Sequence, residues 1–336
     1  SGSGALAIGA VDLFANGAST VYYDDLSLAA PAQPVACDAP ADIPWAGVNP
    51  TAGTTPLSSL SASGNTIGVA GVRTTGSQTY TGNTSTSGDL VSTTSGAIGV
   101  TGNLALSGVS RTISTEIGAI SVSGTTNGAT ALTLDANQGD VTLSGATGGT
   151  TPLTSLAVFG QNIGVNAVTT TGAQGYTSAT NFSVTLNGDL TSTGAGAIGV
   201  DGPTILGAPS VNVSTAGAAG DDIVFDGTVN GASNLSVSAG AANVAINGVA
   251  GGTTRLQSLA VVAANTTSAG VNTGGGQSIT GNLTLGGDLS SNGGGANLLP
   301  PPAPPPPAQP HHPTPAPAGH PRARPVHLGE GEIDED

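Results

Sequence analysis

Three aspartates form the densest set of side chains that could do acid–base chemistry. Asp221, Asp222 and Asp226 lie within Gly-Asp-Asp-Ile-Val-Phe-Asp-Gly. Asp222 and Asp226 are an even number of residues apart, so on a β-strand they would share a face. Two carboxylates about 5–9.5 Å apart can hydrolyse a glycosidic bond. The alternative, which we favour, is that the three residues sit at a turn and accept hydrogen bonds from its backbone amides.

Single aspartates recur in Gly-Asp-Leu triplets, at Asp89, Asp189 and Asp288. Each returns at the same place in a repeated unit, which is typical of a turn residue and not of a unique active site. The tandem Gly-Gly-x-Gly-x-Asp pattern of calcium-binding β-helix repeats does not occur in the sequence. We therefore predict no metal site.

Histidine and cysteine supply no catalytic set. The four histidines all lie in the proline-rich C-terminal region, at His311, His312, His320 and His327. The rest of the chain therefore lacks the base for a Ser-His-Asp triad or a Cys-His pair. Cys37 is the only cysteine, so no internal disulfide can form. We expect a non-catalytic chain with no cofactor.

Charge is scarce and mostly negative. Only 7% of the 336 residues are charged, the formal net charge is −15, and the five cations are all arginines spread along the chain. Nucleic acids and anionic membrane surfaces attract clustered cations, so we expect neither as a partner. The sequence has no run of about 18 apolar residues, and we expect no membrane insertion in this segment.

The composition also indicates where the protein works. Ser, Thr, Asn, Gly and Ala take the place of the charged residues that make up about 25% of an ordinary globular domain. A cytosolic enzyme could have a single cysteine, but long uncharged repeats favour an extracellular or cell-surface location. The sequence contains no Met, so we expect a piece of a longer protein.

The chain divides into four regions. Residues 1–34 contain the alternating segment Val21-Tyr-Tyr-Asp-Asp-Leu-Ser-Leu, which resembles the closing strand of a β-sandwich, and we expect a remnant of such a module. Residues 35–52 form a Pro/Ala-rich linker that holds the only tryptophan, Trp45. Residues 53–295 carry repeats. Residues 296–336 are rich in Pro and acidic at the end, which predicts a disordered tail.

The repeats form three units with markers in the same order. Gly-Thr-Thr-Pro-Leu at residue 53 returns 96 residues later at 149, and as Gly-Thr-Thr-Arg-Leu a further 103 residues on at 252. Three glutamines keep these offsets, at Gln78, Gln174 and Gln277. The units therefore begin near residues 53, 149 and 252.

Short alternating runs fill each unit. Ile120 with Val122, and Val141 with Leu143, are separated by single polar residues, as in strands with one buried face. Aromatic residues make up only 3% of the chain, too few for a sandwich core. A solenoid instead buries small aliphatic side chains between successive turns. We predict an all-β fold, a parallel β-solenoid (β-helix) of about ten or eleven turns.

Two tyrosines occupy matching positions in the first two units. They are Tyr80 and Tyr176, and Ile279 takes their place in the third. Because isoleucine can replace tyrosine there, we expect these side chains to pack in the core and not to stack on sugars.

Three segments of the repeat region begin Asn127-Gly-Ala-Thr-Ala-Leu, Gly149-Thr-Thr-Pro-Leu and Thr170-Thr-Gly-Ala-Gln-Gly-Tyr. They resemble the repeats of filamentous-haemagglutinin-like and autotransporter-passenger-like bacterial surface proteins. The resemblance covers most of residues 53–295. It implies a secreted, non-catalytic adhesin stalk with surface glycans or cell-surface receptors as partners. The alternative is a carbohydrate-binding or polysaccharide-degrading β-helix module, and a mosaic or truncated product without activity also stays open.

Overall fold

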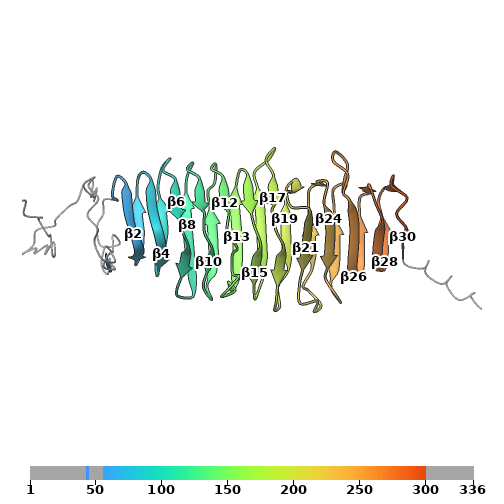
Figure 1. The fold of residues 1–336 in the computed structure, drawn as a ribbon, viewed down its shortest axis with the longest axis horizontal. Coiled ribbons are helices and arrows are strands. Elements are labelled where there is room, and N and C mark those ends of the chain that lie inside the picture. The colour runs from blue at the N-terminus through green and yellow to red at the C-terminus, as the bar shows by residue number, and fades with distance from the viewer. Residues whose placement is uncertain (1–42, 45–55, 300–336) are drawn as a thin grey trace, which may run out of the picture. The chain divides into compact units, whose positions relative to one another are not determined.

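The computed structural model describes residues 43–44 and 56–299. Cys37, Trp45, the four histidines, the predicted sandwich remnant, most of the linker and the chain beyond residue 299 lie outside this part. Every element within it is a β-strand, and the paired strands are parallel. The strands coil into about 11 turns, which stack side by side along one axis (Figure 1). The predicted parallel β-solenoid is confirmed.

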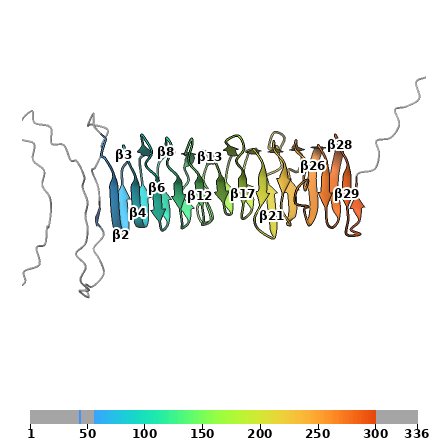
Figure 2. The same ribbon diagram turned by 90° about the horizontal axis from the view of Figure 1, so that it is seen from above.

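Each turn contributes strands to three parallel ladders, named here ladders 1, 2 and 3. Four long strands bend at a corner and contribute a first half to one ladder and a second half to the next. They are β2 (Leu60–Val69), β4 (Gln78–Thr86), β26 (Ser258–Ser268) and β28 (Gln277–Leu285). The view from above shows the same regular succession of turns (Figure 2).

Ladder 1 begins with the first halves of β2 and β4, and Ala250 links β23 to β27 near its end. Its strands are β2 (Leu60–Val69), β4 (Gln78–Thr86), β6 (Ile98–Thr101), β9 (Ile120–Val122), β12 (Val141–Leu143), β14 (Ile163–Val165), β17 (Val184–Leu186), β20 (Thr204–Leu206), β23 (Val229–Asn230), β27 (Val271–Thr273) and β29 (Leu289–Ser291).

Ladder 2 contains the second halves of β2 and β4 and the first halves of β26 and β28, and Thr147 links β10 to β15. Its other strands are β1 (Ile43–Pro44), β7 (Leu104–Leu106), β10 (Thr126–Asn127), β15 (Val168–Thr170), β18 (Leu190–Ser192), β21 (Ser210–Ser214), β24 (Asn234–Ser238) and β30 (Asn297–Leu298).

Ladder 3 ends with the second halves of β26 (Ser258–Ser268) and β28 (Gln277–Leu285). The strands before them are β3 (Val72–Thr74), β5 (Leu90–Ser92), β8 (Ser110–Thr115), β11 (Ala131–Asp135), β13 (Ser155–Gly160), β16 (Gln174–Ser178), β19 (Ile198–Asp201), β22 (Ile223–Phe225) and β25 (Asn243–Ile246).

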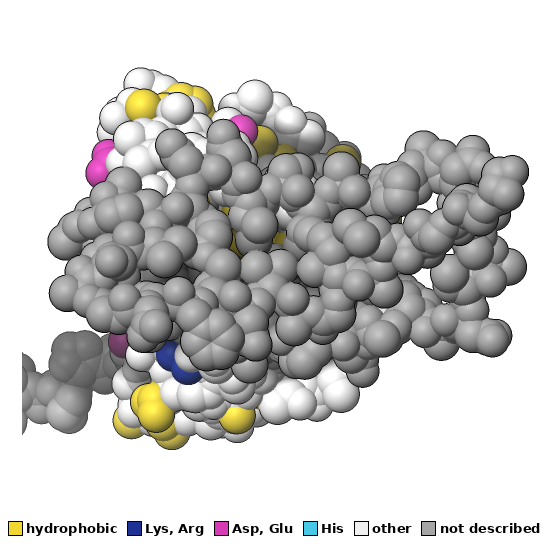
Figure 3. Space-filling model, turned by 90° about the vertical axis from the view of Figure 1, so that its left-hand side faces the viewer, with side chains coloured by type: hydrophobic (Ala, Val, Ile, Leu, Met, Phe, Trp, Pro, Cys, Tyr) yellow, Lys and Arg dark blue, Asp and Glu magenta, His cyan; other side chains and the backbone are white. Residues whose placement is uncertain are grey.

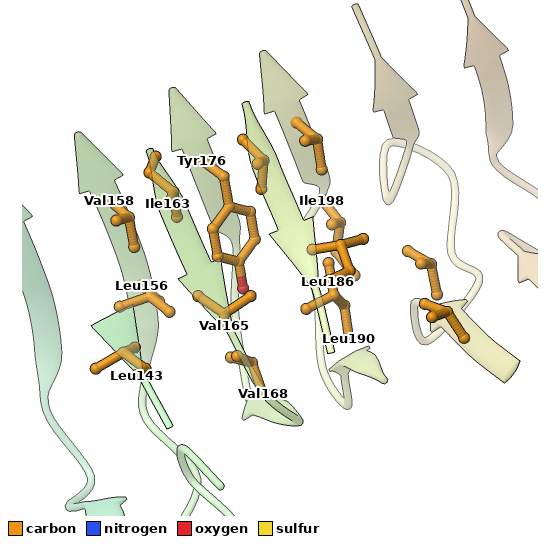
Figure 4. Close-up of a cluster of buried hydrophobic side chains, with 14 of the residues drawn as sticks. Leu143, Leu156, Val158, Ile163, Val165, Val168, Tyr176, Leu186, Leu190 and Ile198 are labelled. Atoms are coloured by element: carbon orange, nitrogen blue, oxygen red, sulfur yellow. The ribbon is translucent and has the colours of Figure 1, made fainter. Parts of the chain in front are cut away.

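The core is a narrow column between the three ladders. Ile98, Ile120, Val141 and Ile163 succeed one another in ladder 1, and each is at most 1% exposed. Burying such a side chain contributes about 1.5–3 kcal/mol, so each turn is stabilised by the turns on both sides. Figure 4 shows how the aliphatic side chains of successive turns surround the ring of Tyr176.

The repeated Gly-Asp-Leu triplets bring neighbouring turns together. A Cβ on Gly88 would overlap the carbonyl oxygen of Ala70 in the preceding turn, so only glycine permits this approach. Leu90 and Leu190, the third residues of the first two triplets, are fully buried. The triplet thus combines a close backbone approach with a core side chain.

Turns and sequence units do not have the same length. The step from Ile67 to Thr84 takes 17 residues, whereas the step from Ile198 to Ile223 takes 25. From Leu60, four turns along ladder 1 lead to Val141.

Equivalent positions of the three units therefore lie on different ladders. Leu156, the counterpart of Leu60, lies on ladder 3, and the next counterpart, Leu259, lies on ladder 2. Each unit is thus rotated by one ladder relative to the unit before it. A surface feature that recurs in every unit faces a different side each time.

Candidate functional site

The three clustered aspartates serve as hydrogen-bond acceptors within the solenoid. Asp221 is 3% exposed, and its two oxygens accept the backbone N–H groups of Gly196 at 2.8 Å and Ala218 at 3.0 Å. Asp222 and Asp226 lie at the two ends of β22, and neither carboxylate is buried. The contact with Ala218, three residues earlier in the chain, favours the interpretation of Asp221 as a turn cap.

The two less buried carboxylates bind the following turn. Oδ1 of Asp222 accepts the backbone N–H of Asn243 at 2.9 Å. Oδ1 of Asp226 accepts Nδ2 of Asn247 at 2.6 Å. The outward placement of both residues agrees with their even spacing, and Oδ1 of each accepts a hydrogen bond from an asparagine of the next turn.

Two of the three aspartates of the Gly-Asp-Leu triplets, Asp89 and Asp189, do the same. Oδ1 of Asp89 accepts the backbone N–H of Thr112 at 2.8 Å, and Oδ1 of Asp189 accepts that of Asn212 at 2.8 Å. These contacts join one turn to the next, across 23 residues of sequence. They are capping contacts between turns, in addition to the backbone ladders.

Asparagines continue this pattern along ladder 3. Nδ2 of Asn265 donates to Oδ1 of Asn243 at 2.8 Å, and Nδ2 of Asn282 donates to Oδ1 of Asn265 at 3.0 Å. Because the backbone N–H of Asn243 is bound by Asp222, four consecutive turns are connected by side chains. A solenoid is expected to stack asparagines of neighbouring turns, but the sequence did not identify these members, since they are far apart in the chain.

An open groove of about 340 Å³ lies on the outer side of ladder 2, and all of its lining residues except Thr150 and Thr151 belong to the first unit. None of its lining residues is charged. They are Thr66, Asn83, Thr84, Ser85, Asn103, Leu104, Ala105, Thr125, Asn127, Thr150 and Thr151. Sequence reasoning did not identify this groove, although Asn127 and the Gly149-Thr-Thr loop stand out as repeated motifs.

Asn127 holds the loop that forms one side of the groove. Its Oδ1 accepts the backbone N–H groups of Thr150 at 2.9 Å and Thr151 at 3.2 Å. In the second unit, Oδ1 of Asn230 accepts those of Thr253 and Thr254 at 2.8 and 3.1 Å. The Asn-Gly-Ala motif therefore anchors the Gly-Thr-Thr loop in both units.

The matched tyrosines lie in the core, as expected. Tyr80 is fully buried and Tyr176 is 1% exposed, and Ile279 is 3% exposed. Burial raises the pKa of both tyrosine hydroxyls well above their ordinary value of 10.0. These rings are packing residues and are not available to stack on a sugar.

The described residues, 43–44 and 56–299, contain neither a candidate metal-binding cluster nor a membrane-spanning helix. No three His, Cys, Asp or Glu side chains of this part gather closely enough to hold a metal ion. No helix of sufficient length and hydrophobicity to span a membrane occurs there.

Comparison of the chain with protein families, with curated proteins and with solved structures finds no match. The β-helix repeat architecture rests on the structure, and the more specific likeness to filamentous-haemagglutinin-like proteins stays a prediction.

Proposed function

We propose that the solenoid is the rigid, non-catalytic stalk of an extracellular or cell-surface protein with an adhesive role. The observation that carries this proposal is the unbroken stack of about 11 turns. At about 4.8 Å per turn the stack measures ~50 Å. A rod of this kind separates whatever lies at its two ends and displays side chains along its length.

The use of the polar side chains supports a structural role. Asp89, Asp189, Asp221 and Asp222 all accept backbone N–H groups. In the view along the stack from its N-terminal end, few charged side chains are visible among the described residues (Figure 3). A surface of this composition suits contacts with surface glycans or cell-surface receptors better than contacts with nucleic acid.

Location can be tested on cells that express the protein. An antibody raised against the solenoid should label intact cells as strongly as permeabilised ones. Labelling that requires permeabilisation would overturn the extracellular assignment. An antibody against a cytosolic protein, which should label permeabilised cells alone, is the control.

Polysaccharide cleavage is the competing activity. The purified chain, incubated with soluble and insoluble polysaccharides, should release no new chain ends. If ends are released, the Asp222→Asn/Asp226→Asn variant decides whether these residues are responsible, because loss of release in the variant would make β22 part of an active site.

A further inference from the structure

We propose that the groove on ladder 2 is a binding site for a neutral oligosaccharide. This names a partner for the adhesive role proposed above and rests on that role. The volume of about 340 Å³ is at the lower end of the range of small-molecule sites. The groove is open, so it can accept part of a longer chain.

The asparagines of the groove leave hydrogen-bond donors free. Oδ1 of Asn103 accepts the backbone N–H of Thr125 at 2.9 Å and its hydroxyl at 3.0 Å. Oδ1 of Asn127 is occupied by the two loop amides. The N–H groups that bind these side chains identify the oxygen of each amide, because an amide nitrogen cannot accept a hydrogen bond. The other amide atom, Nδ2, has no hydrogen-bond partner among the described residues in either asparagine.

Hydroxyl groups complete the lining. Ser85, Thr150 and Thr151 are exposed and border the groove, and the Ser85 hydroxyl donates to the carbonyl oxygen of Ile67 at 3.4 Å. A hydroxyl both donates and accepts a hydrogen bond, whereas an amide nitrogen only donates. Most of the exposed groove surface is nonetheless apolar, with Leu104 and Ala105 in its lining. The groove therefore suits a ligand that has hydroxyl groups beside apolar C–H faces, and a sugar chain has both.

The absence of charged residues in the groove lining narrows the class of ligand. No lysine or arginine lines the groove, so an anionic sugar would lose water without gaining an ion pair. No carboxylate lines it either, so a cationic ligand has no partner there. The chain as a whole has a net charge of −15, which repels anions further. Neutral oligosaccharides remain as the ligand class.

The second unit provides a natural comparison. Its equivalent surface lies on ladder 1, where Pro203 replaces Asn103 and Ile205 replaces Ala105. Ile205 is 44% exposed, and the proline cannot supply an amide donor. The second unit keeps the loop anchor, Asn230, but lacks the donor that Asn103 supplies and carries an exposed isoleucine, so we expect binding at the first groove alone.

The test variants remove the amide NH2 donor of each asparagine but keep the oxygen that accepts the backbone N–H groups. In Asn103→Asp and Asn127→Asp an oxygen still accepts the backbone amides, as Asp89 and Asp189 do elsewhere, while the NH2 donor is lost. The control is Asn230→Asp, which makes the same change at the equivalent anchor outside the groove. Melting temperatures of the three variants report whether the fold is kept.

Binding is measured by NMR titration of the full chain with neutral hexasaccharides of glucan, mannan, galactan and xylan, and with hexagalacturonate as the anionic comparison. We expect saturable binding of at least one neutral sugar, weakened at least fivefold by Asn103→Asp and Asn127→Asp and unchanged by Asn230→Asp.

Three results would overturn the proposal: no saturation with any neutral sugar, equal weakening by the control, or tighter binding of hexagalacturonate. None of them would affect the extracellular assignment, which the labelling of intact cells tests separately.

Discussion

The hydroxyl of Tyr80 donates a hydrogen bond of 2.9 Å to Oε1 of Gln78 inside the solenoid, where both side chains are fully buried. Tyr176 and Gln174 repeat the contact at 2.9 Å one unit later. Since the two units are rotated by one ladder, the same pair occurs on ladder 1 in the first unit and on ladder 3 in the second. The pair is therefore a property of the sequence unit and not of one face.

The third unit lacks this hydrogen bond. Ile279 stands in the tyrosine position, and Oε1 of Gln277 has no partner in the described structure. Nε2 of Gln277 still donates to Thr273 and to the carbonyl of Ser290, at 3.2 and 2.8 Å. The glutamine thus retains its turn-to-turn contact but carries an unsatisfied acceptor.

Removal of one hydroxyl should reproduce that defect in the second unit. Tyr176→Phe leaves Oε1 of Gln174 without a donor, which should lower the free energy of unfolding by about 1–3 kcal/mol. Denaturant unfolding with an unchanged m-value measures this loss. In a Gln174→Leu background the same change should no longer destabilise the protein. A Tyr176→Phe variant as stable as the parent would contradict the assigned hydrogen bond.

Alkaline pH should destabilise the solenoid. Burial raises the pKa of Tyr80 and Tyr176 above the ordinary value of 10.0, so the folded state keeps protons that the unfolded state releases. The contribution of the two tyrosines to the free energy of unfolding is fully present below about pH 10. Above that pH it falls, by up to ~1.4 kcal/mol per pH unit for each tyrosine. Denaturant midpoints between pH 8 and about pH 11.5 measure the slope. The Tyr80→Phe/Tyr176→Phe variant should show a smaller slope, and equal slopes would refute this explanation.

The fold was predicted from the alternation of apolar and polar residues and from the spacing of the repeats. Ile120, Val122, Val141 and Leu143 were expected to face one way, and each is at most 2% exposed. The expected ten or eleven turns agree with the observed number of about 11. Local patterns sufficed here because a solenoid repeats the same short strand many times.

The assignment of strands to ladders could not be predicted from the sequence. All three ladders have the same alternation, and the turns range from the 17 residues between Ile67 and Thr84 to the 25 between Ile198 and Ile223. The rotation of the units follows from the sum of these lengths. The groove depends on it as well, because the register of β7 with β10 places Asn127 opposite Ala105, two residues from Asn103.

A buried threonine offers a site for stabilisation. Oγ1 of Thr126 and Oγ1 of Thr147, on neighbouring turns of ladder 2, both lack a hydrogen-bond partner. Val229 occupies the position of Thr126 in the second unit. Thr126→Val should therefore stabilise the protein by about 1 kcal/mol, since it removes an unsatisfied polar group without changing the shape.

Thermal unfolding of Thr126→Val should show a raised midpoint. Thr170→Val is the matched control, because Oγ1 of Thr170 donates to the carbonyl of Gly172 at 2.5 Å and accepts Nε2 of Gln174 at 3.1 Å. That variant should lower the midpoint. If Thr126→Val lowers it as well, the hydroxyl of Thr126 has a partner in solution.

The turn-to-turn cap at Asp89 should depend on its oxygen and not on its charge. Asp89→Ala removes the acceptor for the backbone N–H of Thr112 and should cost about 1 kcal/mol of unfolding free energy. Asp89→Asn keeps an acceptor and should cost much less, as the anchor Asn127 shows for the same kind of contact. Denaturant unfolding of the two variants at low and high salt separates the contributions. Equal losses in both variants, decreasing with salt, would mean that Asp89 acts through its charge.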